Sequence, residues 1–108
     1  MGILVEEQDI ERTTPQLLTV DVNPVTLSAT RLGLTKRSFF SIIPITAGVT
    51  VTIVFGDSVP VADQGIVLVK NQVFSQSLDT NGAGVFQGTI QAIASGAGQV
   101  ALVEVFEI

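Results

Sequence analysis

Much of the chain alternates between apolar and polar residues with a period of two, the pattern of strands that bury one face. The clearest run covers residues 49–55, where Val51, Ile53 and Phe55 share one face with Val49. Runs of this kind end at clusters of Gly, Pro, Asn and Asp, which favour turns. We therefore expect seven or eight short strands. The weakest is residues 25–30, and the others are residues 17–22, 38–43, 49–55, 66–70, 73–77, 86–93 and 99–106.

Helical signals are weak throughout the chain. No window of a dozen residues combines a clean apolar stripe at helical spacing with an N-cap, and Val, Ile and Thr dominate where strong helix formers would be expected. A chain of 108 residues has room for one domain. Short strands at about ten-residue spacing in a single domain predict an all-β fold, a single antiparallel β-sandwich or jelly roll.

The first 16 residues differ from the rest because they show no apolar period and end in Thr13-Thr14-Pro15. We predict an extended N-terminal arm over residues 1–16 and a β-sandwich domain over residues 17–108. An acidic arm with so few apolar side chains cannot order itself, so we expect a neighbouring subunit to hold it. Its apolar residues are Ile3, Leu4, Val5 and Ile10.

The composition excludes several classes of function. The chain is 46% hydrophobic and 14% charged, with no Cys, His, Trp or Tyr. The missing thiols exclude disulfides and thiol-ligated zinc, and the missing imidazole removes the commonest general base and metal ligand. A net charge of −5 opposes binding to nucleic acid. The uncharged stretches 38–56 and 80–103 are too broken or too polar to cross a membrane. We expect no enzyme, cofactor, small-molecule substrate, nucleic-acid partner or membrane partner.

The acidic residues and the glycine-rich turns do not complete a catalytic or ligand-binding motif. Asp57 and Asp63 lie among turn residues, as expected for an exposed loop rather than for a pair of catalytic carboxylates. Residues 79–82 resemble part of a calcium loop, but Gly88 stands where that motif requires Glu. We therefore expect no catalytic residue and no metal ligand.

Charge is scarce in the body of the chain. Residues 1–37 hold nine of the fifteen charges, whereas residues 38–103 hold four. The polar faces of two predicted strands carry Thr, Gln and no charge, although free monomers usually protect sheet surfaces with charged side chains. We expect sister copies to cover these faces, which makes the protein a homo-oligomer. The only basic cluster, Arg31 with Lys36 and Arg37, is expected at an interface or a solvated edge.

A series of short motifs resembles a known family. The basic residues opening the run 36–43, Gly65-Ile66-Val67-Leu68, the run 86–93 and the run 100–104 resemble small β-sandwich virion proteins of tailed bacteriophages. The chain departs from many of these relatives at Pro44, where they carry Asn, and at Phe86, where they carry Trp or Tyr. The resemblance covers roughly residue 17 onward.

This resemblance implies a structural virion protein, specifically a decoration or cement protein that stabilises a phage head. Such a protein would bind the major capsid protein on the capsid exterior as a homo-oligomer, with a trimer favoured over a dimer, after assembly in the host cytoplasm. The alternatives are a phage tail or fibre module that binds host-surface carbohydrate, and a small hydrolase using Asp57 and Asp63. The residues expected to contact the capsid or another subunit are Ile3, Leu4, Val5, Ile10, Arg12, Arg31, Lys36, Arg37, Thr50, Thr52, Gln87, Thr89 and Gln91.

Overall fold

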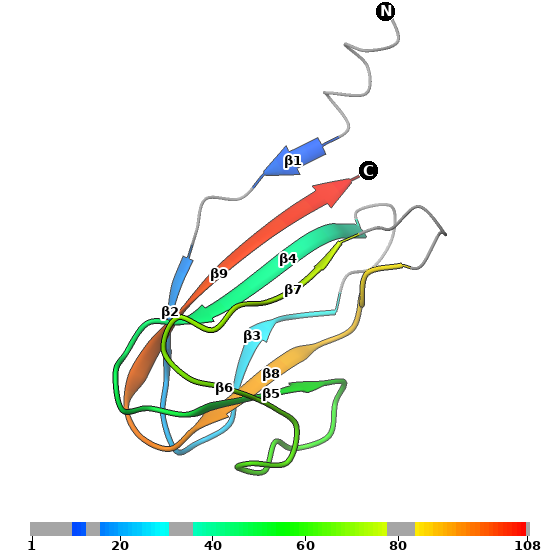
Figure 1. Ribbon diagram of the computed structural model, residues 1–108. Helices are drawn as coiled ribbons and strands as arrows, with labels where there is room; N and C mark the ends of the chain where they lie inside the picture. Colours follow the sequence, from blue (N-terminus) through cyan, green and yellow to red (C-terminus); the bar gives the residue numbers. More distant parts are fainter. Residues whose placement is uncertain (1–9, 13–15, 31–35, 78–83, 108) are drawn as a thin grey trace, which may run out of the picture.

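The computed structural model describes residues 10–12, 16–30, 36–77 and 84–107, and all the regular elements in these ranges are β-strands (Figure 1). Eight of the nine strands overlap the eight runs expected from the alternation of the sequence, so the all-β prediction is confirmed. The largest shift is in the run 86–93, of which only residues 90–93 belong to a strand. The ninth strand, which the alternation does not predict, is the first in the chain order of the described residues. The strands are β1 (Ile10–Arg12), β2 (Gln16–Val20), β3 (Val25–Ser28), β4 (Lys36–Pro44), β5 (Val51–Phe55), β6 (Ile66–Leu68), β7 (Phe74–Ser77), β8 (Ile90–Ala94) and β9 (Gly98–Glu107).

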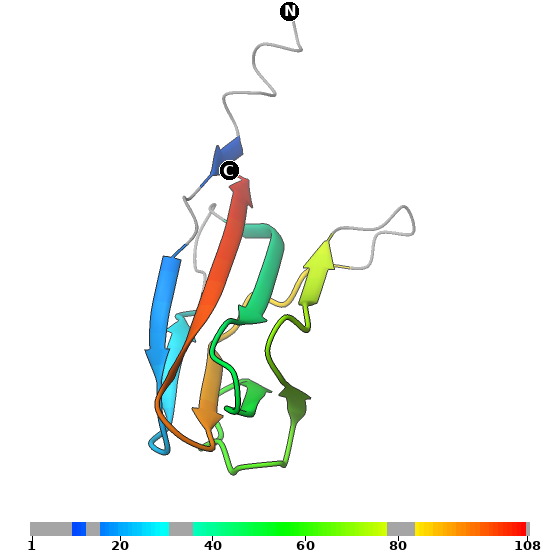
Figure 2. The same cartoon turned by 60° about the vertical axis from the view of Figure 1, so that its left-hand side comes forward.

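The strands form two antiparallel sheets. Sheet A contains β1, β2, β9, β4 and β7, and sheet B has the order β3-β8-β5-β6. Both β1 and β2 pair with β9, one after the other along the same edge, so β2-β9-β4-β7 stands against β3-β8-β5-β6. From β2 onward the chain changes sheet at every connection except β5 to β6, which is the jelly-roll arrangement. Figure 2 shows β2 and β3 on one side of the body, and β6 and β7 on the opposite side.

The core lies between the sheets and follows the predicted alternation. Sheet B contributes the buried side chains of Val51 and Ile53 to the core. Sheet A contributes those of Phe40, Ile42 and Leu102. On the side of β7, four phenylalanines pack together with ring centroids 5.1–6.0 Å apart, a spacing typical of favourable aromatic pairs. These rings belong to Phe40, Phe55, Phe74 and Phe86.

The start of the chain only partly tests the predicted arm. Residues 10–12 form β1 and pair with residues 105–107 of β9, and β2 begins at Gln16. Residues 1–9 and 13–15 lie outside the described residues. Contact of the arm with a neighbouring subunit therefore stays a prediction.

The loop between β5 and β6, residues 56–65, folds back over the outer face of sheet B. Gln91 Nε2 on β8 donates hydrogen bonds to the carbonyl oxygens of Gly56, at 2.7 Å, and Ser58, at 2.9 Å. The backbone N–H of Asp63 donates to Thr52 Oγ1 on β5, at 3.0 Å. The side chains of Thr52 and Gln91 on this face are thus hydrogen-bonded within the chain.

Gly65, the last residue of this loop, lies close against β5. A Cβ at this position would lie 2.6 Å from the carbonyl oxygen of Ile53 and 3.1 Å from Thr52 Cγ2. Gly65→Ala is therefore expected to lower the free energy of unfolding by about 1–3 kcal/mol, because the loop must lift from the sheet. Urea unfolding followed by far-UV circular dichroism measures this change. The matched control is Gly96→Ala, where a Cβ meets nothing within 4 Å; equal stability of the two variants would contradict the predicted clash.

Candidate interaction surface

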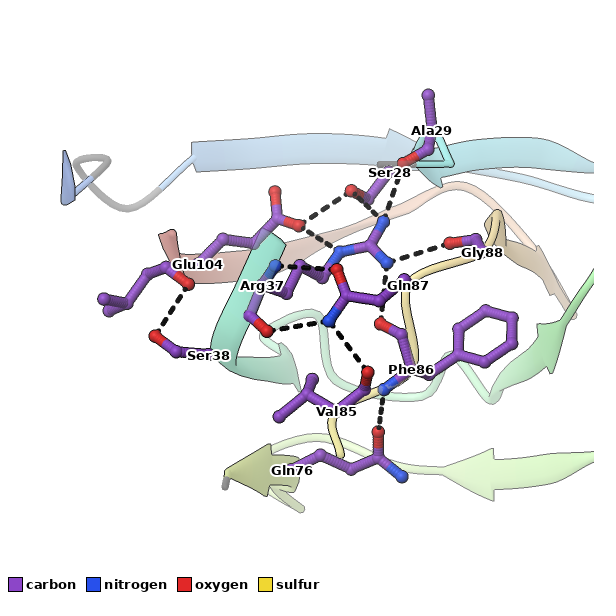
Figure 3. A network of polar contacts seen from close by, with 11 residues as sticks. Ser28, Ala29, Arg37, Ser38, Gln76, Val85, Phe86, Gln87, Gly88 and Glu104 are labelled. Carbon is purple, nitrogen blue, oxygen red and sulfur yellow. Dashed lines mark hydrogen bonds and ion pairs between the residues drawn. The ribbon is translucent and has the colours of Figure 1, made fainter. Parts of the chain in front are cut away.

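Arg37 on β4 is the largest charged side chain in the interior, with 1% of its surface exposed. Its guanidinium group uses all five of its N–H donors (Figure 3). The acceptors are Glu104 Oε2 at 2.8 Å, the carbonyl oxygens of Phe86 and Gly88 at 2.8 and 2.9 Å, and Ser28 Oγ and the Ala29 carbonyl oxygen, both at 2.7 Å.

These contacts join segments that are distant in the sequence. Ser28 ends β3, Glu104 lies on β9, and Phe86 and Gly88 belong to the segment that leads into β8. Ser28 Oγ also donates to Glu104 Oε2, at 2.7 Å, so the three side chains form a closed set. Because every guanidinium donor already has an acceptor within the chain, Arg37 has none left for a ligand. The cluster is a clamp between the sheets.

Gln87 extends this clamp to the edge of β4. Its Oε1 accepts from the backbone N–H of Arg37 at 2.7 Å, and its Nε2 donates to the carbonyl oxygens of Arg37 and Val85, both at 2.8 Å. Pairing of β4 with β7 ends at Phe39. Just beyond that point, Gln87 takes the place of a neighbouring strand and hydrogen-bonds the backbone N–H and C=O of Arg37. An edge satisfied in this way cannot accept a strand from another molecule.

Sequence reasoning did not single out Glu104. The sequence does contain a signal for its burial, because Glu104 occupies an alternate position along β9 between the apolar residues Leu102 and Phe106, which share the buried face with Val100. A charge on such a face requires a partner in the interior. The choice of Arg37 as that partner depends on the pairing of β4 with β9, which local periodicity does not reveal.

The structure moves two predicted contact residues away from the surface. Arg37, predicted at an interface or a solvated edge, is instead buried in the clamp. Thr52 has 2% of its surface exposed, because the loop over sheet B covers it. Both corrections have the same cause: segments remote in sequence fold over positions that alternation alone assigns to solvent.

The other predicted contact residues fall into two groups. Gln87 and Gln91 are half-buried and hydrogen-bonded within the chain, and Thr89 Oγ1 lies 2.9 Å from Thr30 Oγ1. Lys36 is exposed and Thr50 is half-buried at the surface, so their contact with a partner stays a prediction. Four of the predicted contact residues lie outside the described ranges: Ile3, Leu4, Val5 and Arg31. Two others are described only as positions on β1: Ile10 and Arg12.

The outer face of sheet A has a different character. Residues opposite one another on neighbouring strands share a face, so the strand register defines rows across the sheet. One row joins Leu17, Ala101 and Ile43, and the register continued by one residue adds Val73. Leu17 and Val73, at the two ends of this row, are 61% and 57% exposed. The next two rows are Val103, Ser41 and Ser75, then Val105, Phe39 and Ser77.

The ten residues of these rows that lie on β2, β9, β4 and β7 are uncharged, and six of the seven on β2, β9 and β4 are apolar. Charges return at the tip of the sheet, where the register places Arg12 opposite Val105 and Lys36 opposite Glu107. Contiguous apolar surface of this kind marks interaction sites in soluble proteins. The outer face of sheet A is therefore the candidate interaction surface of the described structure.

Comparison of the chain with protein-family models, with curated proteins and with solved structures found no match. Within the described ranges, no helix has the length and apolarity to cross a bilayer. Those ranges also contain no cluster of three or more acidic side chains placed to hold a metal ion.

Proposed function

We propose that this protein is a structural component of a bacteriophage virion, a decoration or cement protein that binds the capsid exterior as a homo-oligomer. The observation that carries the proposal is the uncharged outer face of sheet A, with its exposed Leu17 and Val73. Covering a surface of this composition with another protein lowers the free energy, because apolar side chains leave water. The resemblance of the sequence to small phage virion proteins supports the capsid as the site of action.

The polar interior supports the same proposal. The guanidinium of Arg37 and the amides of Gln87 and Gln91 are used to hold strands and loops of the same chain together. The side chains with the strongest hydrogen-bonding capacity thus serve the fold. A protein whose polar side chains are used in this way acts through the area of its surfaces, and many modest contacts on a capsid add up through valency.

Phage heads with and without the protein test the proposal. Heads that lack it are expected to disrupt at a lower temperature than complete heads, and added purified protein is expected to bind them saturably and restore heat resistance. A variant lacking residues 1–9 keeps every described strand, so it is expected to fold but to bind heads more weakly, because the arm is proposed to lie along the major capsid protein.

Two results would contradict this function. One is equal heat resistance of heads with and without the protein, combined with no binding of the purified chain. The other is saturable binding to host-surface glycans on an array without binding to heads, which would favour a tail or fibre module.

A further inference from the structure

We infer that the outer face of sheet A is the surface through which copies of this chain associate with one another. The inference rests on the homo-oligomer of the proposed function and assigns a surface to it. The occupant of the face is a second copy of the chain, and three features of the molecule favour that occupant.

The first feature is electrostatic. The chain carries a net charge of −5, so two copies repel each other on average. The rows contain no charged residue on β2, β9, β4 or β7, and Arg12 of β1, at the end of the third row, is basic, so contact there does not bring carboxylates together. This face is thus the part of the described surface on which an acidic protein meets its own copy at the lowest electrostatic cost.

The second feature is the difference between the two sheets. The loop at residues 56–65 covers part of the outer face of sheet B and binds Thr52 and Gln91 there. Exposed apolar side chains occur on both sides of the molecule. Those of sheet B, Val59, Val61 and Val67, lie on the covering loop and the edge strand, whereas Leu17 and Val73 end an uncharged row that crosses sheet A. Apolar sheet faces are stabilised when another sheet packs on them, and a second copy supplies a face of matching shape and composition.

The third feature is the available area. The ten residues of the three rows lie on strands about 4.8 Å apart, with neighbours on one face of a strand about 6.8 Å apart, so they cover about 330 Å². Contact over these rows buries about 330 Å² per copy, or about 650 Å² in total, which is below the roughly 1,200 Å² of stable interfaces and in the range of weak, transient association. We therefore expect an association that depends on protein concentration.

The test measures molecular mass by light scattering across a dilution series. The wild-type chain is expected to shift from the 11.3 kDa monomer to a dimer or trimer as its concentration rises. Leu17→Lys and Val73→Lys place a charge at either end of the apolar row on side chains that are already exposed, so the fold is retained. Each is expected to raise the dissociation constant of self-association at least tenfold.

The matched control is Val67→Lys. Val67 is an exposed valine on the edge strand of sheet B, 41% exposed, and its replacement changes the net charge by the same amount. Its dissociation constant is expected to match that of the wild type. A wild-type chain that stays monomeric at every concentration overturns the inference, as does a control that dissociates as readily as the two sheet A variants.

Spin labels give an independent measurement, because the chain has no native cysteine. Ser75→Cys places a label on the outer face of sheet A, and Thr26→Cys places one on β3 of sheet B; both positions are exposed. Pulsed electron paramagnetic resonance is expected to give the shorter intermolecular distance for Ser75→Cys. The opposite order contradicts the assigned face.

The two proposals fail separately. A monomer that still protects heads from heat removes the interface and leaves the virion role. A homo-oligomer that dissociates in the sheet A variants but does not bind heads removes the virion role and leaves the interface.

Discussion

Replacing Arg37 with methionine is expected to lower the free energy of unfolding by about 3–5 kcal/mol, the usual consequence of removing one partner from a buried ion pair. Arg37→Met leaves the carboxylate of Glu104 in the interior without the guanidinium 2.8 Å away. It also removes the donors to the carbonyl oxygens of Ala29, Phe86 and Gly88. Urea unfolding followed by far-UV circular dichroism suits this measurement, since the chain has no Trp or Tyr for fluorescence.

The neighbouring residue provides the control for this experiment. Lys36→Met removes the same charge from an exposed side chain and is expected to change stability by less than about 0.5 kcal/mol. Arg37→Lys keeps the charge but has three donors instead of five, so we expect an intermediate loss. The double variant Arg37→Met/Glu104→Leu is expected to recover part of the stability, because neither charge remains buried. A loss below about 1 kcal/mol in Arg37→Met would show that the clamp does not stabilise the fold.

The second large effect is expected for Phe40→Ala. Phe40 is fully buried on β4, and its ring lies 6.0 Å from those of Phe55 and Phe74. Removing the ring leaves a cavity between the sheets and is expected to cost about 3–5 kcal/mol. For a domain of this size, that loss lowers the Tm by more than about 12 °C, which a thermal melt detects directly.

The adjacent residue offers a matched comparison. Phe39 lies on the outer face of sheet A, where it is half-buried, so Phe39→Ala removes the same ring from the opposite side of the strand. In dilute monomer it is expected to lower stability by less than about 2 kcal/mol, since the outer side leaves no enclosed cavity. If Phe39→Ala were the more destabilising change, the assignment of the two faces of β4 would be wrong.

The strands were predictable because their signal is local. The alternation in Val51-Thr52-Ile53 and the turn residues after Phe55 lie within one short stretch, and the structure places β5 there. β1 was not expected as a strand, because Ile10–Arg12 has no alternation of its own and is defined by its pairing with β9.

The sequence predicted the uncharged character of the candidate surface but not its location in the fold. Scarcity of charge correctly indicated uncharged sheet surface, but two of the residues predicted to form it, Thr52 and Gln91, lie on strands of sheet B under the β5–β6 loop. The rows of sheet A combine Leu17, Ile43 and Ala101 from three strands, so they exist only once the strand order is known. The burial of Arg37 likewise depends on Glu104, 67 residues away in the chain.

The central position of β9 in sheet A has a consequence for the order of folding. β9 is the last of the described strands in sequence order, yet β1, β2 and β4 all pair with it. Such long-range pairing closes large loops and slows folding relative to local hairpins. During synthesis, β2 and β4 stay without their shared neighbour until β9 leaves the ribosome, and the rows of the outer face do not exist before then. The proposed association through sheet A therefore requires chains in which β9 has already paired with β2 and β4.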